Sequence, residues 1–386
     1  LEAMERAGEV DPVRAQAALL RRVIAGLETS LLPPIQDSAR ARATLLETLG
    51  RVPLEARKAW LKGVSIDDPA ALGLRGDGPT RWSPQEQAWI LSSFLAAVGP
   101  TAPWTEEKAL QRLWEPVLAS GSPNLLRNFL EAVKDAEGPG AAAFAATLPP
   151  HLTQPIQKAW LLPALRKHQP RAADTLREEL LWGADATARA AALEDLPTRP
   201  EGAAWERLHR LVWEAADLDP REALIAALER WPMTPTQRID LLRPWLGHPD
   251  WTSRYQAFLA LRKLDPATPW PTAPQPNARE KALLALATRL AEAGKPVRLR
   301  FSFDGGRTLT LRLDPTLAPI NVANLVTLVR KGFYNGRRIG RVVPDFVVQL
   351  GSPYDTLDGG PGHSVRCENS PTWYGPGSVG MALSGK

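Results

Sequence analysis

The spacing of apolar residues changes near Gly294, and this change constrains the fold more than any other feature of the sequence. Before Gly294, apolar side chains recur every three or four positions, which is typical of amphipathic helices. After it, they alternate with polar side chains, which is typical of strands that bury one face. The sequence therefore predicts a multidomain chain in which a long all-α region is followed by a smaller β-rich domain.

The predicted helices are separated by short segments rich in proline and glycine. Four of the clearest cover residues 11–28, 83–98, 122–136 and 219–231, and each begins at an Asp-Pro or Ser-Pro pair. The first side chain of such a pair can accept a hydrogen bond from the first helical turn, and proline has no N–H to leave unpaired there. Because the connections are short, neighbouring helices are expected to run antiparallel.

A weak internal repeat runs through this region. In each copy an arginine is followed, after two intervening positions, by a small or aliphatic residue and then a bulky residue, and after two further positions by a leucine. The copies begin at Arg42, Arg189, Arg221 and Arg254, and the last three are 32 and 33 residues apart. This spacing is close to the length of one helical hairpin. Since a hairpin cannot bury its apolar face alone, such hairpins stack into a solenoid.

The remaining features of the helical region fit the same picture. With the turn at His248-Pro249-Asp250, the helices resemble HEAT-type repeats. Thirteen of the 14 tryptophans lie before Gly294 at helical spacing, which is typical of a packed core. Five prolines between Asp265 and Asn277 predict a stiff, extended connection. A last helix is predicted over 278–293, because Gly294 suits the left-handed position that ends many helices.

The segment after Gly294 predicts strands and one further helix. Residues 297–303 and 308–313 flank Asp304-Gly305-Gly306-Arg307, which is typical of a β-hairpin. Further predicted elements are a helix over 319–330 and strands over 338–343, 346–350 and 378–383. The predicted domains are the HEAT-like repeats over 1–264, the connection and last helix over 265–294, and the β-rich domain over 295–386.

Several motifs follow one another along the β-rich domain. Residues 334–351 read Y-N-G-R-R-I-G-R-V-V-P-D-F-V-V-Q-L-G and are followed by the loop Gly359-Gly360-Pro361-Gly362. R-C-E-N at 366–369 and G-S-V-G-M-A-L-S-G-K at the C-terminal end continue the series. This order resembles the cyclophilin-type peptidyl-prolyl cis-trans isomerases over about residues 295–386. The resemblance implies the opening half of an eight-stranded antiparallel β-barrel.

Rotation about a prolyl peptide bond needs no nucleophile, metal or cofactor. The barrier is about 20 kcal/mol because the amide is conjugated, so a donor that favours the twisted, pyramidal nitrogen accelerates the rotation. The resemblance makes Arg341 this donor. It assigns the pocket for the proline ring to Phe346 and Val347, and the contact with the substrate backbone to Gln349. The strand that contacts the peptide is assigned to Ala382 and Leu383.

The chain departs from the family pattern in three places. Ile339-Gly340 stands where the family has Phe-His, so one polar wall of the cleft is expected to be missing. Leu350-Gly351-Ser352 stands where Gly-Gly-Asp is usual. The sequence ends at Lys386, before a segment that supplies aromatic residues and a histidine to the cleft in the family. We therefore expect a fragment of a longer protein or an incomplete barrel, with weak or no activity in this chain.

Charge and hydropathy disfavour several other classes of protein. The net charge is +5, and from Lys295 onward 12 Lys and Arg residues stand against 6 Asp and Glu. These cations are scattered without a stripe of aromatic residues, so we expect a solvated basic surface and no nucleic-acid partner. The near-neutral helical region likewise disfavours a nucleic-acid-binding solenoid. With no run of about 18 apolar residues, no membrane span is predicted.

Metal and nucleotide sites are also disfavoured. The five histidines lack metal-ligand spacing. The single cysteine, Cys367, excludes an internal disulfide and is expected to be a buried structural thiol. Residues 380–386 spell most of a phosphate-binding loop, but the middle of this motif is apolar and strand-like. The sequence therefore predicts neither a metal nor a cofactor.

The favoured function is prolyl isomerisation of proline-containing protein substrates, which assists their folding. In this hypothesis the helical repeats are a docking surface for a protein partner. The alternative is a non-catalytic adaptor or scaffold that only grips proline-containing peptides. We expect a soluble, bacterial-looking protein, and the sequence does not distinguish the cytoplasm from the periplasm.

Overall fold

The computed structural model of the protein describes residues 107–272, 275–343, 347–370, 372–373, 375 and 377–381. These residues fall into two compact units that divide between Asp195 and Leu196. The helices predicted over 11–28 and 83–98 and the repeat copy at Arg42 lie outside the described residues.

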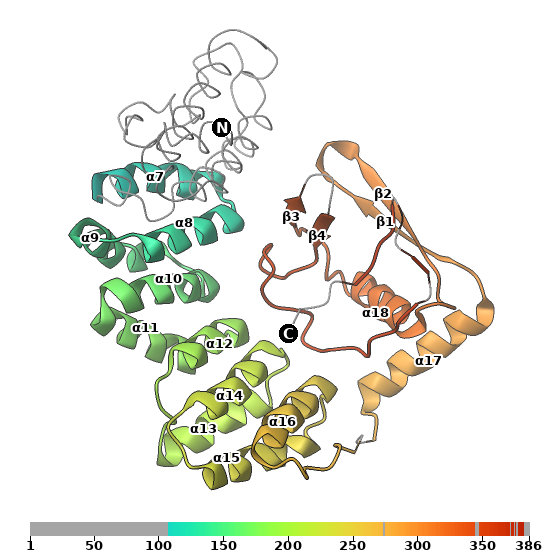
Figure 1. The fold of residues 1–386 in the computed structure, drawn as a ribbon. Helices are drawn as coiled ribbons and strands as arrows, with labels where there is room; N and C mark the ends of the chain where they lie inside the picture. The colour runs from blue at the N-terminus through green and yellow to red at the C-terminus, as the bar shows by residue number, and fades with distance from the viewer. Residues whose placement is uncertain are drawn as a thin grey trace, which may run out of the picture. The chain divides into compact units, whose positions relative to one another are not determined.

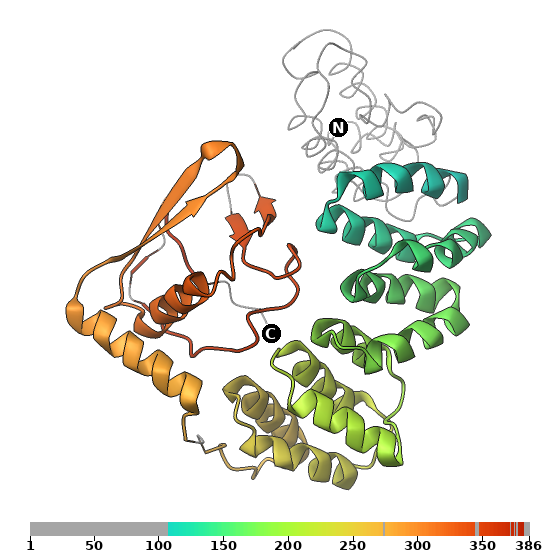
Figure 2. The same ribbon diagram turned by 180° about the vertical axis from the view of Figure 1, so that it is seen from behind.

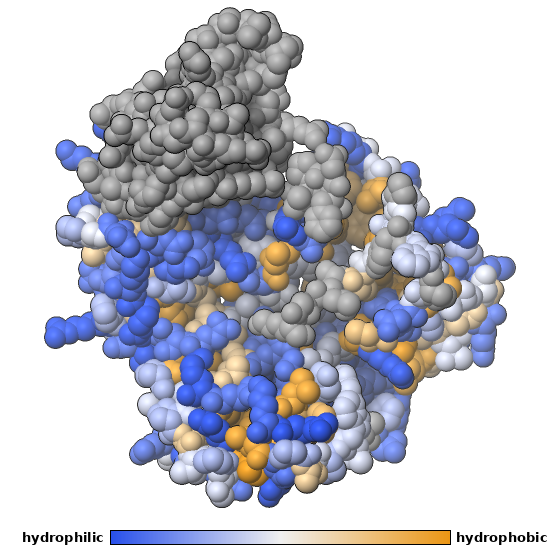
Figure 3. All heavy atoms as spheres, in the orientation of Figure 1, coloured by the Kyte–Doolittle hydropathy of each residue, from blue (hydrophilic) through white to orange (hydrophobic). Residues whose placement is uncertain are grey.

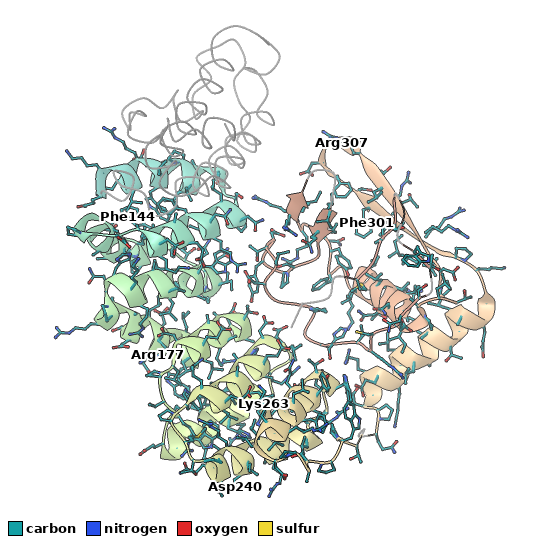
Figure 4. The ribbon with its side chains drawn as sticks, viewed as in Figure 1. Phe144, Arg177, Asp240, Lys263, Phe301 and Arg307 are labelled. Atoms are coloured by element: carbon teal, nitrogen blue, oxygen red, sulfur yellow. The ribbon has the colours of Figure 1, made fainter. Side chains whose placement is uncertain are left out.

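The first unit is helical throughout its described part and is stacked helix upon helix (Figure 1). Its helices are α7 (Glu107–Ser120), α8 (Pro123–Asp135), α9 (Pro139–Thr147), η1 (Pro149–His151), α10 (Pro155–His168), α11 (Pro170–Trp182) and α12 (Ala186–Asp195). Phe129 and Phe144 meet edge to face in its core with ring centroids 5.8 Å apart, and Figure 4 labels Phe144. Helix α8 begins as predicted, since the Ser122 hydroxyl accepts a hydrogen bond from the Leu125 N–H at 3.3 Å.

The second unit begins with four α-helices and one 3-10 helix. They are α13 (Gly202–Trp213), α14 (Asp219–Arg230), α15 (Pro235–Leu242), η2 (Arg243–Gly247) and α16 (Trp251–Leu264). The prediction that Asp219 caps α14 is wrong by one residue, because Asp219 already lies in the first turn and Leu218 holds the cap position without a side-chain hydrogen bond. Asp250 does cap α16, where its carboxylate accepts from the Ser253 N–H at 3.0 Å.

The repeat arginines have a common structural role. Arg189, Arg221 and Arg254 are 5%, 4% and 4% exposed and lie one turn into α12, α14 and α16. Each guanidinium donates to a backbone carbonyl of the connection that precedes its helix. The acceptors include the carbonyl oxygens of Leu181, Ala215 and His248, respectively. The arginines therefore satisfy carbonyl groups that the preceding helix or turn leaves without a partner.

The structure also extends the repeat beyond the predicted pattern. An aspartate precedes each of the three arginines by four residues: Asp185, Asp217 and Asp250. Asp185 accepts from the Ala188 N–H at 2.8 Å, as Asp250 does from Ser253. In α12 and α16 the aspartate thus accepts from the first turn of the same helix that carries the buried arginine. Since no family label is established for them, the term HEAT-like remains a prediction.

The proline-rich connection is anchored at its start. Trp270 lies edge to face against Phe258 of α16 with ring centroids 4.8 Å apart, and Pro271 is buried. The connection is therefore held against α16 at Trp270. Helix α17 (Ala278–Ala293) follows with the predicted bounds.

Both ends of α17 use local signals. The Asn277 side chain accepts from the Glu280 N–H, and the Glu280 side chain accepts from the Asn277 N–H, each at 2.9 Å. At the other end, Gly294 takes the left-handed conformation with φ of 62°, which costs glycine little. The predicted end of the helix is confirmed.

A hairpin and two helices form a small core in the C-terminal part. Strands β1 (Val297–Ser302) and β2 (Thr308–Leu313) pair antiparallel, and Arg307 lies at the tip of this hairpin (Figure 4). Leu299 of β1 is buried with Val322 and Val326 of α18 (Pro319–Arg330). In Figures 1 and 2, α18 lies beside α17, which adds partly buried leucines to the same cluster.

A second antiparallel pair consists of β3 (Ile339–Val343) and β4 (Val347–Leu350). The described residues thus contain two two-stranded sheets, and the eight-stranded barrel implied by the resemblance remains a prediction. The strand predicted over 378–383 is wrong for its described part, because residues 378–381 pair with no described strand. Ala382 and Leu383 lie outside the described residues.

Among the residues that Figure 3 colours, hydrophilic ones cover most of the visible surface and apolar ones appear in patches. Within the part of the chain that the structure describes, no helix is both long and apolar enough to cross a membrane.

Candidate active site

The candidate site is built on the β3–β4 hairpin, whose register contains a bulge. Ile339 pairs with Leu350, whereas Arg341 pairs with Gln349, so the register shifts by one residue at Gly340. Without this shift, Arg341 would stand opposite Val348. The bulge therefore decides which side chain of β4 the arginine faces.

Arg341 and Gln349 are joined side chain to side chain. The Arg341 Nη1 donates to the Gln349 Oε1 at 2.7 Å. Val347 lies two residues before Gln349 and thus on the same face of β4, and both side chains are half-buried. The hairpin therefore brings together three of the six predicted site residues. Phe346, Ala382 and Leu383 lie outside the described residues.

Gly340 also explains the departure from the family's Phe-His pair. A Cβ atom on Gly340 would lie only 2.7 Å from the carbonyl oxygen of Thr356, so a side chain cannot fit without moving that backbone. Thr356 is held by its neighbour, since its hydroxyl donates to the Asp358 carboxylate at 3.0 Å. In this chain a backbone segment lies where the Phe-His pattern would place a histidine side chain.

The second departure has little effect on the hairpin. Leu350, which stands where glycine is usual, is 42% exposed and projects from the edge of β4. The following Gly351 keeps the left-handed conformation with φ of 111° and lies against the Tyr334 ring. The turn after β4 is therefore still made by a glycine.

The loop over 352–362 packs onto the start of β3. Asp355 accepts from the Arg338 N–H at 2.8 Å through its side chain. Gly359 has φ of 71°, and a Cβ atom there would lie 2.8 Å from the Tyr354 ring and 2.9 Å from Pro353. Both the conformation and the close packing require glycine at this position. The glycine-rich loop is thus a packed element beside the hairpin.

Glu368 of the R-C-E-N motif caps α18. Its two carboxylate oxygens accept from the Ile320 and Asn321 N–H groups at 2.8 Å each, and from the Asn321 side-chain amide at 2.8 Å. Sequence reasoning missed this role. A signal was available, because α18 starts at Ala318-Pro319 without a capping side chain, so its first N–H groups need an acceptor from elsewhere.

Cys367 is exposed, so the prediction of a buried thiol is wrong. Its neighbour Glu368 turns inward to cap α18, which leaves the cysteine on the outer side of the segment. Across the described ranges, no group of His, Cys, Asp and Glu is placed to hold a metal ion.

Comparison with known proteins identifies the C-terminal segment. Residues 298–386 match the family described as cyclophilin type peptidyl-prolyl cis-trans isomerase/CLD. A peptidyl-prolyl cis-trans isomerase of Helicobacter pylori is 48% identical over 71 residues, which are 18% of this chain and 44% of the relative. Peptidyl-prolyl cis-trans isomerase B of Bacillus subtilis is 40% identical over 88 residues, which are 22% of this chain and 62% of the relative.

A third relative, a peptidyl-prolyl cis-trans isomerase of Synechococcus elongatus, is 39% identical over 79 residues, 20% of this chain and 54% of that protein. The chain spans about half the length of the curated relatives it matches. No solved structure gives a significant match. The motifs, the hairpin and the matched relatives agree: residues 298–386 are a segment of the cyclophilin-type peptidyl-prolyl cis-trans isomerase family, and a helical region precedes it.

Proposed function

We propose that the protein catalyses cis–trans isomerisation of prolyl peptide bonds in protein substrates, with Arg341 as the catalytic donor. The observation that carries this proposal is the Arg341–Gln349 pair. It joins a cation and an amide on one face of a hairpin, beside the half-buried Val347, within a segment of an isomerase family. An ordinary surface arginine would need neither the bulge at Gly340 nor the glutamine opposite.

The chemistry requires a group that binds the twisted amide better than the planar one. When the prolyl C–N bond rotates, its nitrogen loses conjugation and becomes a hydrogen-bond acceptor. A guanidinium donor placed at this nitrogen therefore stabilises the transition state more than the ground state. Arg341 carries five N–H donors, and one of them donates to Gln349.

Gln349 has two roles in this proposal. Its Oε1 accepts from Arg341, which fixes the direction of the guanidinium. Its NH2 group carries two donors that can bind a carbonyl oxygen of the substrate backbone. Val347 and Phe346 are proposed to form the wall of the proline pocket, and Ala382 and Leu383 the strand beside the peptide.

The helical repeats are proposed as the docking surface for protein clients. Support comes from Trp251 at the start of α16 and Trp270 in the connection that follows it, which are 41% and 58% exposed with ring centroids 5.7 Å apart. Exposed tryptophans of this kind are common anchors in protein interfaces. The folding clients themselves are proposed to be proline-containing proteins.

Isomerisation of an X-Pro peptide by the whole protein tests the catalytic proposal. Replacing Arg341 by alanine should lower kcat/KM roughly thirty- to a thousand-fold, because a charge-assisted contact of about 2–4 kcal/mol is lost from the transition state. Arg312→Ala, an exposed arginine on β2, is the matched control and should leave kcat/KM unchanged. Equal activity of the Arg341→Ala variant and the parent would refute the assignment.

The same assay separates the enzyme from the adaptor. A protein that binds prolyl peptides tightly but does not change their isomerisation rate is an adaptor, and peptide binding measured by calorimetry alongside the rate distinguishes the two. Loss of turnover in Arg341→Ala with peptide affinity retained supports the enzyme.

A further inference from the structure

The loop that follows the glycine-rich motif contacts the helical repeats directly. The Ser364 hydroxyl donates to the Asp250 Oδ2 at 2.6 Å, and these residues are 114 positions apart in the chain. Asp250 is the cap of α16. A residue of the isomerase segment, residues 298–386, therefore contacts the start of a repeat helix.

Asp250 is part of a buried polar network that joins two repeats. Its Oδ1 accepts from the Ser253 N–H and hydroxyl at 3.0 Å and 3.2 Å. Arg221 of α14 donates to the Ser253 hydroxyl at 2.9 Å and lies 3.8 Å from the Asp250 carboxylate. Burial would raise the pKa of Asp250, but the hydrogen bonds from Ser364 and Ser253 together with Arg221 keep it below its usual range. The carboxylate is thus ionised and ready to accept at neutral pH.

The residues before Ser364 make two further contacts. A Cβ atom on Gly362 would lie 3.5 Å from the Cβ of Ala216, in the turn before α14. His363 lies with its Nε2 2.8 Å from the side-chain oxygen of Asn324, which is buried on α18. Three consecutive residues therefore meet, in order, the turn before α14, helix α18 and the start of α16. Only the middle contact lies within the isomerase segment.

We propose that the turns preceding α14 and α16 form an intramolecular docking site for residues 362–364, so that the helical repeats hold this loop of the isomerase segment in place. The occupant is thus the chain's own loop, identified by the Ser364–Asp250 hydrogen bond and by the close approach of Gly362 to Ala216. Protein clients that use the repeats must therefore bind another face or displace the loop. This proposal concerns the position of the loop and does not depend on the isomerase activity.

Disulfide trapping tests the docking in solution. Cysteines at Ala216 and Gly362 should form a disulfide under mild oxidation with diamide, because their Cβ atoms lie 3.5 Å apart, within the range of about 3.5–4.5 Å that disulfides need. The native Cys367 is replaced by serine in this variant. The control pair places cysteines at Ala203, an exposed residue of α13, and Gly362. Trapping no faster than in the control pair would overturn the proposal.

Proteolysis provides a second test, in which Gly362, a residue in the left-handed conformation, is not replaced. Arg366 is exposed two residues after Ser364, so trypsin cleavage there reports release of the loop. Ser364→Ala should speed this cleavage about tenfold, because a hydrogen bond to a charged acceptor is lost. Ser370→Ala is the control, since Ser370 makes only a local turn contact with Thr372. A rate equal to that of the parent, measured by mass spectrometry of the fragments, would contradict the docking.

Discussion

Arg341 faces Gln349 across the β3–β4 pair, and the guanidinium of the first donates to the amide oxygen of the second at 2.7 Å. This contact depends on a third residue, because the bulge at Gly340 shifts the register by one position. In the proposed mechanism each residue has a separate role: Gly340 sets the register, Gln349 orients the guanidinium, and Arg341 carries the charge toward the substrate.

The first prediction concerns Gln349. Gln349→Leu removes the acceptor that orients Arg341 and the donors proposed for the substrate backbone, while keeping a side chain of similar size. We expect kcat/KM to fall about tenfold to a hundredfold in the X-Pro peptide assay. Val348→Thr changes the neighbouring residue on the opposite, exposed face and should leave activity unchanged. A Gln349→Leu variant as active as the parent would show that the guanidinium needs no partner.

The second prediction concerns Gly340. Gly340→Ala places a methyl group 2.7 Å from the Thr356 carbonyl oxygen, so the bulge or the 352–358 loop must shift. We expect the free energy of unfolding to fall by about 1–3 kcal/mol in urea titrations, together with a loss of isomerase activity. Gly360→Ala is the control, since a Cβ atom there meets nothing within 4 Å. Similar stability losses in both variants would remove the special role of Gly340.

The third prediction concerns Glu368, which caps α18 although it lies 48 residues after Ile320 in the chain. Glu368→Ala leaves the Ile320 and Asn321 N–H groups without their carboxylate, and these groups carry the positive end of the helix. Unfolding should become easier by about 1–2 kcal/mol, measured by urea titration followed by circular dichroism. Glu292→Ala, at an exposed position on α17, should change stability by less than about 0.5 kcal/mol. An equal effect of both substitutions would argue against the cap.

The fourth prediction concerns pH. Burial lowers the pKa of His248, whose Nε2 donates to the Trp213 carbonyl at 3.1 Å and whose Nδ1 accepts from the Asp250 N–H at 3.0 Å. Both ring nitrogens thus have the partners of a neutral imidazole. Burial also lowers the pKa of His209, which lies among the rings of Trp205, Trp213 and Trp245.

A lowered folded-state pKa means that the unfolded chain binds protons more readily. The stabilisation is complete above the unfolded value of about 6.5 and is lost as the pH falls below it toward the folded pKa. The free energy of unfolding should therefore decrease between pH 7.5 and pH 5. His248→Gln, which cannot titrate, should show a shallower decrease over this range. An unchanged slope would indicate that His248 titrates normally in the folded protein.

The elements predicted most accurately are those whose signals are local. Helix α17 has the predicted bounds because Asn277 and Gly294 lie at its two ends, and α18 likewise matches the predicted 319–330. Arg341 and Gln349 could be placed together because the motif spaces them along one hairpin. The predicted cap of α14 is wrong by one residue, because the turn before this helix has two aspartates, Asp217 and Asp219, and either residue type suits a cap position.

What the sequence could not predict depends on residues far apart in the chain. The need for glycine at position 340 follows from a carbonyl 16 residues later, at Thr356, and the cap of α18 comes from a glutamate about 48 residues away. The exposure of Cys367 follows from the inward turn of its neighbour. No local pattern encodes such contacts, because a motif fixes the order of residues but not which backbone groups meet.

The hydrogen bond from Ser364 to Asp250 has a consequence for the order of folding. It closes a loop of 114 residues, whereas Arg254 reaches the carbonyl of His248 only six residues away. Closing a long loop costs more chain entropy than closing a short one, and local contacts form faster. During synthesis the helices also leave the ribosome first. The isomerase segment therefore folds last, onto a surface of repeats that is already complete, and the carboxylate of Asp250 is in place before its partner arrives.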